Sequence, residues 1–303
     1  MFDRLWSANA RVVGGDKLRV LGDGGYEIGS RATIIRDRLM ARNRFAARDL
    51  LNIQLDTSAT FLARWRDLAM RTLTPAATSG HPERAEFRTV LETTWPGTAA
   101  PDSAAYRFTR MFREEAADRT IASVLAECYE ADPTFDYKAI RRRDAPIWKL
   151  LNEQPMHLLD PRFASWNALL LEAIDAVITD LHDVDSGPLR DRVWSEYNRT
   201  EYRHPLSAGL PFAGRWLDMP YVPLAGDLYT PNVHWDTHAP SARMIVSPGR
   251  EDAGIMEMPT GQSGHPLSPF YANSHPAWVM GAPTPFLPGR AAHSLTLTPS
   301  GGR

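Results

Sequence analysis

Apolar residues recur at helical spacing in four segments of the first two thirds of the chain. Proline and glycine separate these segments, and neither residue continues a helix well. No repeat of fixed period is present, which argues against a solenoid. The pattern therefore predicts a layer of separate helices, over residues 27–42, 57–73, 104–125 and 163–181.

Polar residues that can cap a helix precede two of these segments. Asp56, Thr57 or Ser58 can cap the second, and Asp102 and Ser103 stand directly before the third. We therefore expect both helices to begin at these positions.

The pattern changes near residue 205. Fifteen of the 24 prolines follow residue 200, which favours loops and strands over helices. Residues 243–247 and 255–258 are short β-type runs joined by a proline- and glycine-containing connection, and residues 294–298 alternate with period two.

Residues 4–7 also read as a strand. We expect one sheet with strands from both chain ends and a large helical lobe between them, so the fold class is α+β. The expected division is a strand and loop over 1–23, a helical lobe over 24–204, and a proline- and glycine-rich region with sheet strands over 205–303.

Composition adds few constraints. With 43% hydrophobic and 23% charged residues, the chain has the make-up of an ordinary globular protein. The formal net charge of −2 gives no reason to expect a nucleic acid or an anionic membrane as partner. The basic run 141–143, beside Asp144, is interpreted as a solvated helix end.

Neither a membrane span nor a signal peptide is recognised. No stretch approaches 18 apolar residues, and Phe2, Asp3 and Arg4 after Met1 do not resemble a leader. For a genuine start codon this indicates a cytoplasmic product, whereas for a truncated chain it indicates nothing. The single cysteine, Cys128, lies in an apolar pattern and is interpreted as a packed thiol.

Two polar residues near the N-terminus are candidates for chemistry. The side-chain amide of Asn9 can donate a hydrogen bond to an oxyanion, although the residues alone favour an Asx turn between strand and loop. Arg31, at the start of the first expected helix, can orient an amide or bind a carboxylate, and can also be a solvated arginine of a charged helix.

Two further motifs carry weaker signals. In an extended segment His234, Asp236 and His238 would share one face and could hold zinc or iron, which makes a small metalloprotein one hypothesis. Residues 261–269 contain a serine between Gln262 and Gly264 but lack the spacing of a nucleophile elbow. A tight turn that depends on glycine is the better interpretation.

These motifs together resemble the penicillin acylase (penicillin amidase) family. Residues 258–271, Met-Pro-Thr-Gly-Gln-Ser-Gly-His-Pro-Leu-Ser-Pro-Phe-Tyr, with Trp278 and Gly281, are similar to its C-terminal signature, and residues 241–248 resemble the preceding strand. Leu-Trp-Ser-Ala-Asn-Ala-Arg at 5–11 resembles the segment with the catalytic asparagine, and 25–39 resembles the helix that carries an arginine.

The resemblance implies N-terminal-nucleophile chemistry on a four-layer αββα sandwich. In this family, which includes cephalosporin and acyl-homoserine-lactone acylases, an N-terminal serine attacks an N-acyl amide and its own α-amino group acts as base. Asn9 maps onto the oxyanion-hole asparagine, and Arg31 onto the arginine that orients this asparagine and the substrate. Ala10 stands where many members have a second asparagine.

The chain has no N-terminal Ser, Thr or Cys, so we expect a C-terminal fragment whose nucleophile lies upstream. The family's backbone oxyanion donor and calcium site would also lie upstream, and no cofactor or metal is expected here. The expected partners are the upstream half of the precursor and a small N-acyl substrate. If the precursor follows the family, it is periplasmic or secreted. The alternative function is a non-catalytic binding or assembly module that keeps the acylase C-terminal fold.

Overall fold

The structure is a computed structural model that describes residues 3–22, 24–140, 142–235 and 238–299. The chain divides into two compact units, one formed by residues 1–43 and 53–239 and the other by residues 44–52 and 240–303. The fold class is α+β, as expected, with many helices and one two-stranded antiparallel sheet in the described part of the chain. The three-part division expected from the sequence stays a prediction.

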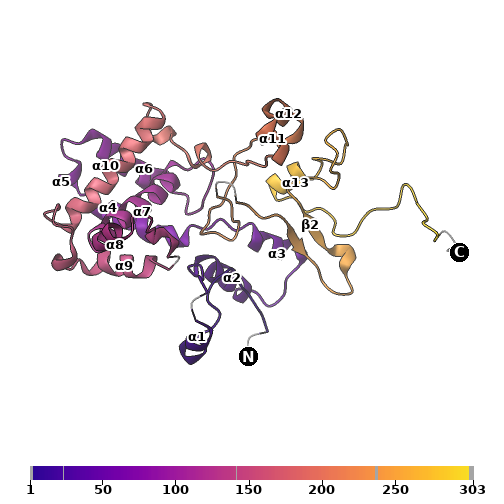
Figure 1. Ribbon diagram of the computed structural model, residues 1–303, viewed down its shortest axis with the longest axis horizontal. Coiled ribbons are helices and arrows are strands. Elements are labelled where there is room, and N and C mark those ends of the chain that lie inside the picture. The colour runs from indigo at the N-terminus through magenta and orange to yellow at the C-terminus, as the bar shows by residue number, and fades with distance from the viewer. Residues whose placement is uncertain (1–2, 23, 141, 236–237, 300–303) are drawn as a thin grey trace. The chain divides into compact units, whose positions relative to one another are not determined.

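The first unit is helical (Figure 1). Its α-helices are α1 (Gly15–Leu21), α2 (Ser30–Met40), α4 (Thr60–Thr72), α5 (Pro75–Thr78), α6 (Pro82–Thr93), α7 (Ala104–Ala122), α8 (Ala126–Ala131), α9 (Asp144–Glu153), α10 (Trp166–Val184), α11 (Pro205–Gly209) and α12 (Gly214–Leu217). Short 3-10 turns join them, η1 (Tyr137–Ala139), η2 (Met156–Leu158), η3 (Leu189–Asp191), η4 (Trp194–Glu196) and η5 (Pro211–Ala213). The four helices predicted from apolar spacing are confirmed as α2, α4, α7 and α10.

The helix starts follow the predicted caps in one of two cases. Ser103 caps α7, since its side chain accepts a hydrogen bond from the backbone N–H of Tyr106 at 3.0 Å. The predicted cap of α4 is wrong, because α4 follows Ala59 without a side-chain cap. Asp56 instead accepts from the backbone N–H of Ser58 and pairs with Arg38.

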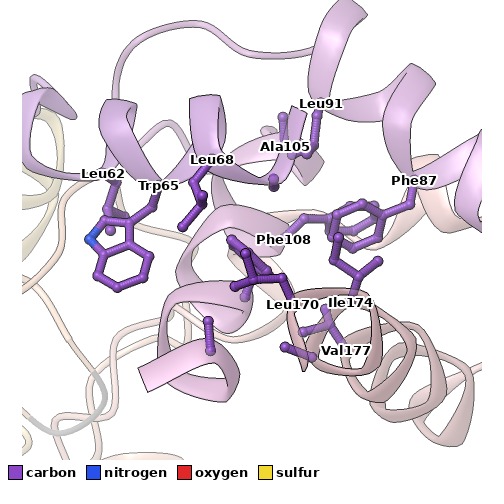
Figure 2. Packing of buried hydrophobic residues seen from close by; sticks show 14 of the residues in the cluster. Leu62, Trp65, Leu68, Phe87, Leu91, Ala105, Phe108, Leu170, Ile174 and Val177 are labelled. Atoms are coloured by element: carbon purple, nitrogen blue, oxygen red, sulfur yellow. The ribbon is translucent and has the colours of Figure 1, made fainter. Parts of the chain in front are cut away.

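The core of the first unit lies where α4, α6, α7 and α10 meet. Figure 2 shows Phe108 of α7 among Phe87 of α6 and Leu170 and Ile174 of α10. The rings of Phe87 and Phe108 stack with centroids 4.8 Å apart. Apolar positions at helical spacing on each helix therefore face one shared core.

The second unit contains a hairpin and a short helix. Strands β1 (Arg243–Ile245) and β2 (Ile255–Glu257) pair antiparallel, with Met244 opposite Met256, as the sequence predicts. They are joined through the 3-10 turn η6 (Glu251–Ala253) and followed by α13 (His275–Met280). Helix α3 (Ala47–Gln54) begins within the residues of this unit.

A buried ion pair holds the second unit together. Arg243 and Glu257 face each other across the two strands at 2.8 Å, and Arg243 also donates to the carbonyl of Trp278 at 2.9 Å. Both charged side chains are almost fully buried, so removing either partner would leave an uncompensated charge.

The expected strands at the two chain ends are wrong. Residues 4–7 and 294–298 adopt no strand in the structure, although Ala10 forms an isolated parallel bridge with Glu27. Leu295 and Leu297 are 86% and 84% exposed instead of half-buried. Alternating sequence favours a strand only where a second strand is present to accept its backbone hydrogen bonds.

The glycine turn predicted over residues 261–269 is confirmed. The backbone N–H of Gly261 donates to Tyr271 at 2.7 Å, and that of Ser263 donates to Phe270 at 3.1 Å. A Cβ atom at position 261 would lie 1.9 Å from the carbonyl oxygen of Phe270, which no side chain tolerates. The close approach of two backbone segments therefore requires glycine at this position.

Gly261→Ala is expected to destabilise the second unit by about 2–3 kcal/mol, because the backbone must move to admit the methyl group. Hydrogen exchange of the Ser263 amide measures the effect. Gly264→Ala is the matched control, since a Cβ at that position meets nothing within 4 Å. Equal protection in the two variants would contradict the role of this contact.

Candidate active site

Asn9 lies in a left-handed backbone conformation with φ 59°. Asparagine adopts this conformation more readily than most residues. Its carbonyl oxygen accepts a hydrogen bond from the backbone N–H of Glu27 at 2.9 Å, beside the bridge that joins Ala10 to Glu27. The segment that carries Asn9 is thereby attached to the segment that leads into α2.

The structure brings Asn9 and Arg31 together. Arg31, in the first turn of α2, donates from Nη2 to the Oδ1 atom of Asn9 at 3.1 Å. Because a guanidinium only donates, the amide oxygen of Asn9 must face Arg31, and the Nδ2 group is left to donate to another acceptor. The pKa of Arg31 is lowered from its ordinary value, because the effect of burial outweighs the opposing charge of the Glu27 carboxylate.

Both residues line a cavity of about 980 Å³ in the first unit. Its volume suits a small-molecule ligand. The charged side chains that line it are Glu27, Arg31, Arg107, Arg110, Arg113, Glu114, Glu115, Lys138, Arg143, Asp144 and Asp180. Apolar and aromatic side chains line it as well, including Ile28, Met111, Trp194, Leu228, Tyr229, Val233 and Trp235.

A buried charge network forms part of the cavity wall. Arg110 of α7 lies 3.2 Å from Asp227 and also pairs with Glu114. The hydroxyl of Tyr106 donates to Asp227 at 2.7 Å. Burial raises the pKa of Asp227, although the charge of Arg110 counteracts this effect.

Arg113 extends the network to α9. Its Nη2 and Nε atoms donate to the same oxygen of Asp144, at 2.6 and 3.1 Å. Arg110 and Arg113 lie over the ring of Tyr229, 5.0 and 5.5 Å from its centroid, and burial raises the pKa of this phenol to about 12. Each arginine therefore has a carboxylate partner and an aromatic support, which fixes this wall of the cavity.

The sequence predicted α7 but not its charged face. Arg107, Arg110 and Arg113 recur at intervals of three residues, and Glu114 follows Arg110 by four. Polar residues at this spacing share one side of a helix, so this stripe could have indicated the charged face of α7. Their partners, Asp144 and Asp227, are too distant in sequence for any local pattern to reveal them.

Acid is expected to destabilise the protein through Glu114. Burial would raise the pKa of Glu114, but Arg110 and Arg113 outweigh it and lower the value to about 2. A carboxylate with a depressed folded pKa stabilises the fold above its unfolded value and loses that contribution as pH falls. The free energy of unfolding should therefore decrease by up to about 3 kcal/mol between about pH 4.5 and pH 2. This figure is an upper bound, because the raised pKa of Asp227 acts in the opposite direction.

Urea unfolding at several pH values measures this dependence. Glu114→Gln should be less stable than the wild type at pH 7 and should show a smaller loss between pH 4.5 and pH 2. Glu115→Gln changes the neighbouring carboxylate, which pairs with Arg119. This variant should lose as much stability between pH 4.5 and pH 2 as the wild type. An unchanged acid dependence in Glu114→Gln would contradict the assignment.

The metal hypothesis receives no structural support from the described residues. Asp236 lies outside them, and His234 is buried with its Nδ1 atom 2.7 Å from Oδ1 of Asn198. The ring of His238 stacks on Trp235, with centroids 4.7 Å apart. Within the part of the chain that the structure describes, no group of three or more His, Cys, Asp or Glu side chains is arranged to hold a metal ion.

Two smaller expectations are wrong. Cys128 is exposed on α8, and no residue of this helix is buried. Arg143 is not a solvated helix end, since it donates to the carbonyl of Lys138 at 2.6 Å, lies over the ring of Tyr137 and lines the cavity. Arg141, in the same basic run, lies outside the described residues.

None of the helices in the described part of the chain is both long enough and apolar enough to cross a bilayer.

Comparison with known proteins assigns the chain to a family. The model of the penicillin amidase family matches residues 3–293, which include the segment of Asn9, helix α2 and the C-terminal glycine turn. The chain belongs to the penicillin amidase family. The resemblance recognised from the sequence motifs is thus confirmed.

One relative indicates how much of such a protein this chain represents. Penicillin acylase 2 proenzyme of Pseudomonas sp. (strain SE83) is 27% identical over 273 residues. The match covers 85% of this chain but 33% of the relative, so the chain spans about a third of the length of the curated relative it matches.

Proposed function

We propose that this chain is the C-terminal part of an N-terminal-nucleophile amidohydrolase that cleaves N-acyl amide bonds. The observation that carries the proposal is the hydrogen bond from Arg31 to Asn9 at the wall of a cavity, in a chain of the penicillin amidase family. The relative from Pseudomonas sp. is named as an acylase proenzyme, which supports amide hydrolysis by a processed precursor.

In the proposed reaction, a serine at the N-terminus of another segment attacks the carbonyl carbon of the amide. Its own α-amino group takes the hydroxyl proton, and the carbonyl oxygen becomes an oxyanion. The Nδ2 group of Asn9 donates to this oxyanion, while Arg31 holds the Oδ1 side of the same amide. The intermediate collapses, the proton passes to the leaving amine, and water then hydrolyses the acyl-serine ester to the free acid.

The proposal also concerns the remaining strands of the fold. The described residues form one two-stranded sheet, so the other strands of an αββα sandwich would come from the upstream part of the precursor. The calcium site and the backbone oxyanion donor would belong to that upstream part.

The proposal is tested with the complete precursor and a panel of chromogenic N-acyl anilides. We expect release of the aniline, and we expect acid quenching during turnover to trap an acyl group on a serine outside residues 1–303. Mass spectrometry of the digested protein locates that group. A precursor that cleaves no member of the panel, or an acyl group on a residue of this chain, would overturn the proposal and favour a non-catalytic module or a different nucleophile.

A further inference from the structure

Tyr229 lies on a tight turn that several hydrogen bonds fix. The Oγ1 atom of Thr230 accepts from the backbone N–H of Asp227 at 3.0 Å, and the N–H of Thr230 donates to the carbonyl oxygen of Asp227 at 3.2 Å. Asp227 is held in turn by the hydroxyl of Tyr106 and by Arg110 of α7. Since Asp227 and Thr230 are fully buried, the backbone that carries Tyr229 is fixed before any ligand arrives.

The ring of Tyr229 is closely packed. The centroid of the Phe61 ring lies 4.5 Å from that of Tyr229. The Cζ atoms of Arg110 and Arg113 lie 5.0 and 5.5 Å from the same centroid, and the whole residue is only 6% exposed. Because these contacts leave the ring little freedom to move, the packing also sets the position of its hydroxyl.

The hydroxyl of Tyr229 has no hydrogen-bond partner in the part of the chain that the structure describes. Its oxygen keeps accessible surface, unlike the indole nitrogens of Trp65 and Trp166, which are buried without a partner. Tyr229 lines the cavity that Asn9 and Arg31 also line. A buried tyrosine usually finds a partner for its hydroxyl, so an accessible hydroxyl without one, on a cavity wall, points to an acceptor inside the cavity.

The surroundings of the hydroxyl favour an uncharged acceptor. Burial outweighs the charges of Arg110 and Arg113 and raises the pKa of Tyr229 to about 12, so the hydroxyl keeps its proton and donates at neutral pH. Both arginines already have carboxylate partners, which are Glu114, Asp144 and Asp227. Because both guanidiniums are occupied in this way, a carbonyl oxygen fits beside Tyr229 better than a further carboxylate does.

We propose that Tyr229 is a specificity-determining residue: its hydroxyl donates a hydrogen bond to an uncharged carbonyl oxygen that the substrate carries in addition to its scissile amide. The favoured substrates are then N-acyl amides with a keto or second amide oxygen on the acyl or the amine side. This inference rests on the proposed function and names the class of amide that the site takes. Tyr229 takes part in no bond-making step, so its hydrogen bond stabilises bound substrate and transition state alike.

Tyr229→Phe removes the hydroxyl and keeps the ring. The substrates are pentanoyl anilide, a series of oxoalkanoyl anilides that moves one keto oxygen along the acyl chain, and pentanoyl 4-acetylanilide, with the oxygen on the amine side. Succinyl anilide supplies a carboxylate instead. In the complete precursor we expect KM for at least one keto substrate to rise about 3–10-fold with kcat nearly unchanged, because one neutral hydrogen bond is lost. KM for pentanoyl anilide should not change.

Tyr221→Phe is the matched control. Tyr221 is exposed, its hydroxyl donates to Glu201 at 3.2 Å, and it does not line the cavity, so this variant should keep the wild-type constants for every substrate. A wild-type KM for all keto substrates in Tyr229→Phe would overturn the proposal. An equal rise for pentanoyl anilide would assign Tyr229 to packing alone, and a larger rise for succinyl anilide would exclude the uncharged acceptor.

A measurement on residues 1–303 separates this inference from the proposed function, which a precursor that hydrolyses no amide would reject by itself. With ¹³C-labelled tyrosine, the ring resonance of Tyr229 is identified by its absence in Tyr229→Phe. At equal concentrations an oxoalkanoyl anilide should shift this resonance more than pentanoyl anilide does. Equal shifts with the two kinds of anilide, or no shift with either, would overturn the role of Tyr229 whatever the activity.

Discussion

Phe108→Ala is expected to lower the free energy of unfolding by about 3–5 kcal/mol. Phe108 is fully buried in α7 and stacks on Phe87, and Leu170 and Ile174 of α10 lie beside it (Figure 2). Removing the ring deletes these contacts and leaves a cavity that the surrounding helices fill only partly. Urea unfolding of the chain, followed by its helical circular dichroism, measures the loss.

Phe212→Ala is the matched control for this prediction. Phe212 is 69% exposed in η5, and its removal should change the stability by less than about 0.5 kcal/mol. A loss below 1.5 kcal/mol in Phe108→Ala, or equal losses in the two variants, would contradict the packing described for the first unit.

Asn9→Ala in the complete precursor is expected to lower kcat by about 10²–10³, the usual effect of removing one oxyanion donor. KM should change little, because the hydrogen bond strengthens only when the carbonyl oxygen acquires charge. Steady-state hydrolysis of an N-acyl anilide measures both parameters. The fold should be retained, since the side chain of Asn9 is exposed and contributes no core packing.

Two variants sharpen this test. Asn9→Asp can keep the contact with Arg31 but cannot donate from its second oxygen, so it should be as impaired as Asn9→Ala. Asn43→Ala changes an exposed asparagine that does not line the cavity and should keep wild-type kcat. A loss of less than threefold in Asn9→Ala would show that its amide does not stabilise the transition state.

The helices could be predicted from the sequence because their determinants are local. The apolar residues of α7 and its cap Ser103 lie within a few residues of one another in the sequence. The two strands of the hairpin, β1 and β2, are likewise joined by one short connection. The expected strands at 4–7 and 294–298 failed because a strand depends on a neighbour, which no local pattern supplies.

The candidate site was predictable as residues but not as geometry. The motifs indicated Asn9 and Arg31, and their roles stay predictions. Their hydrogen bond joins residues 22 positions apart, which no local pattern reveals. The charged wall was missed because its ion pairs join distant segments, such as Arg113 with Asp144. Cys128 was placed wrongly because apolar neighbours in sequence do not specify which face of a short helix meets the core.

The central claim is that this chain supplies Asn9 and Arg31 to an active site whose nucleophile lies in another segment. The most direct test is turnover of an N-acyl anilide by purified residues 1–303 beside the complete precursor. We expect release of the aniline by the precursor and none by residues 1–303 alone. Turnover by residues 1–303 that Asn9→Ala abolishes would contradict it, because the chain would then contain its own nucleophile.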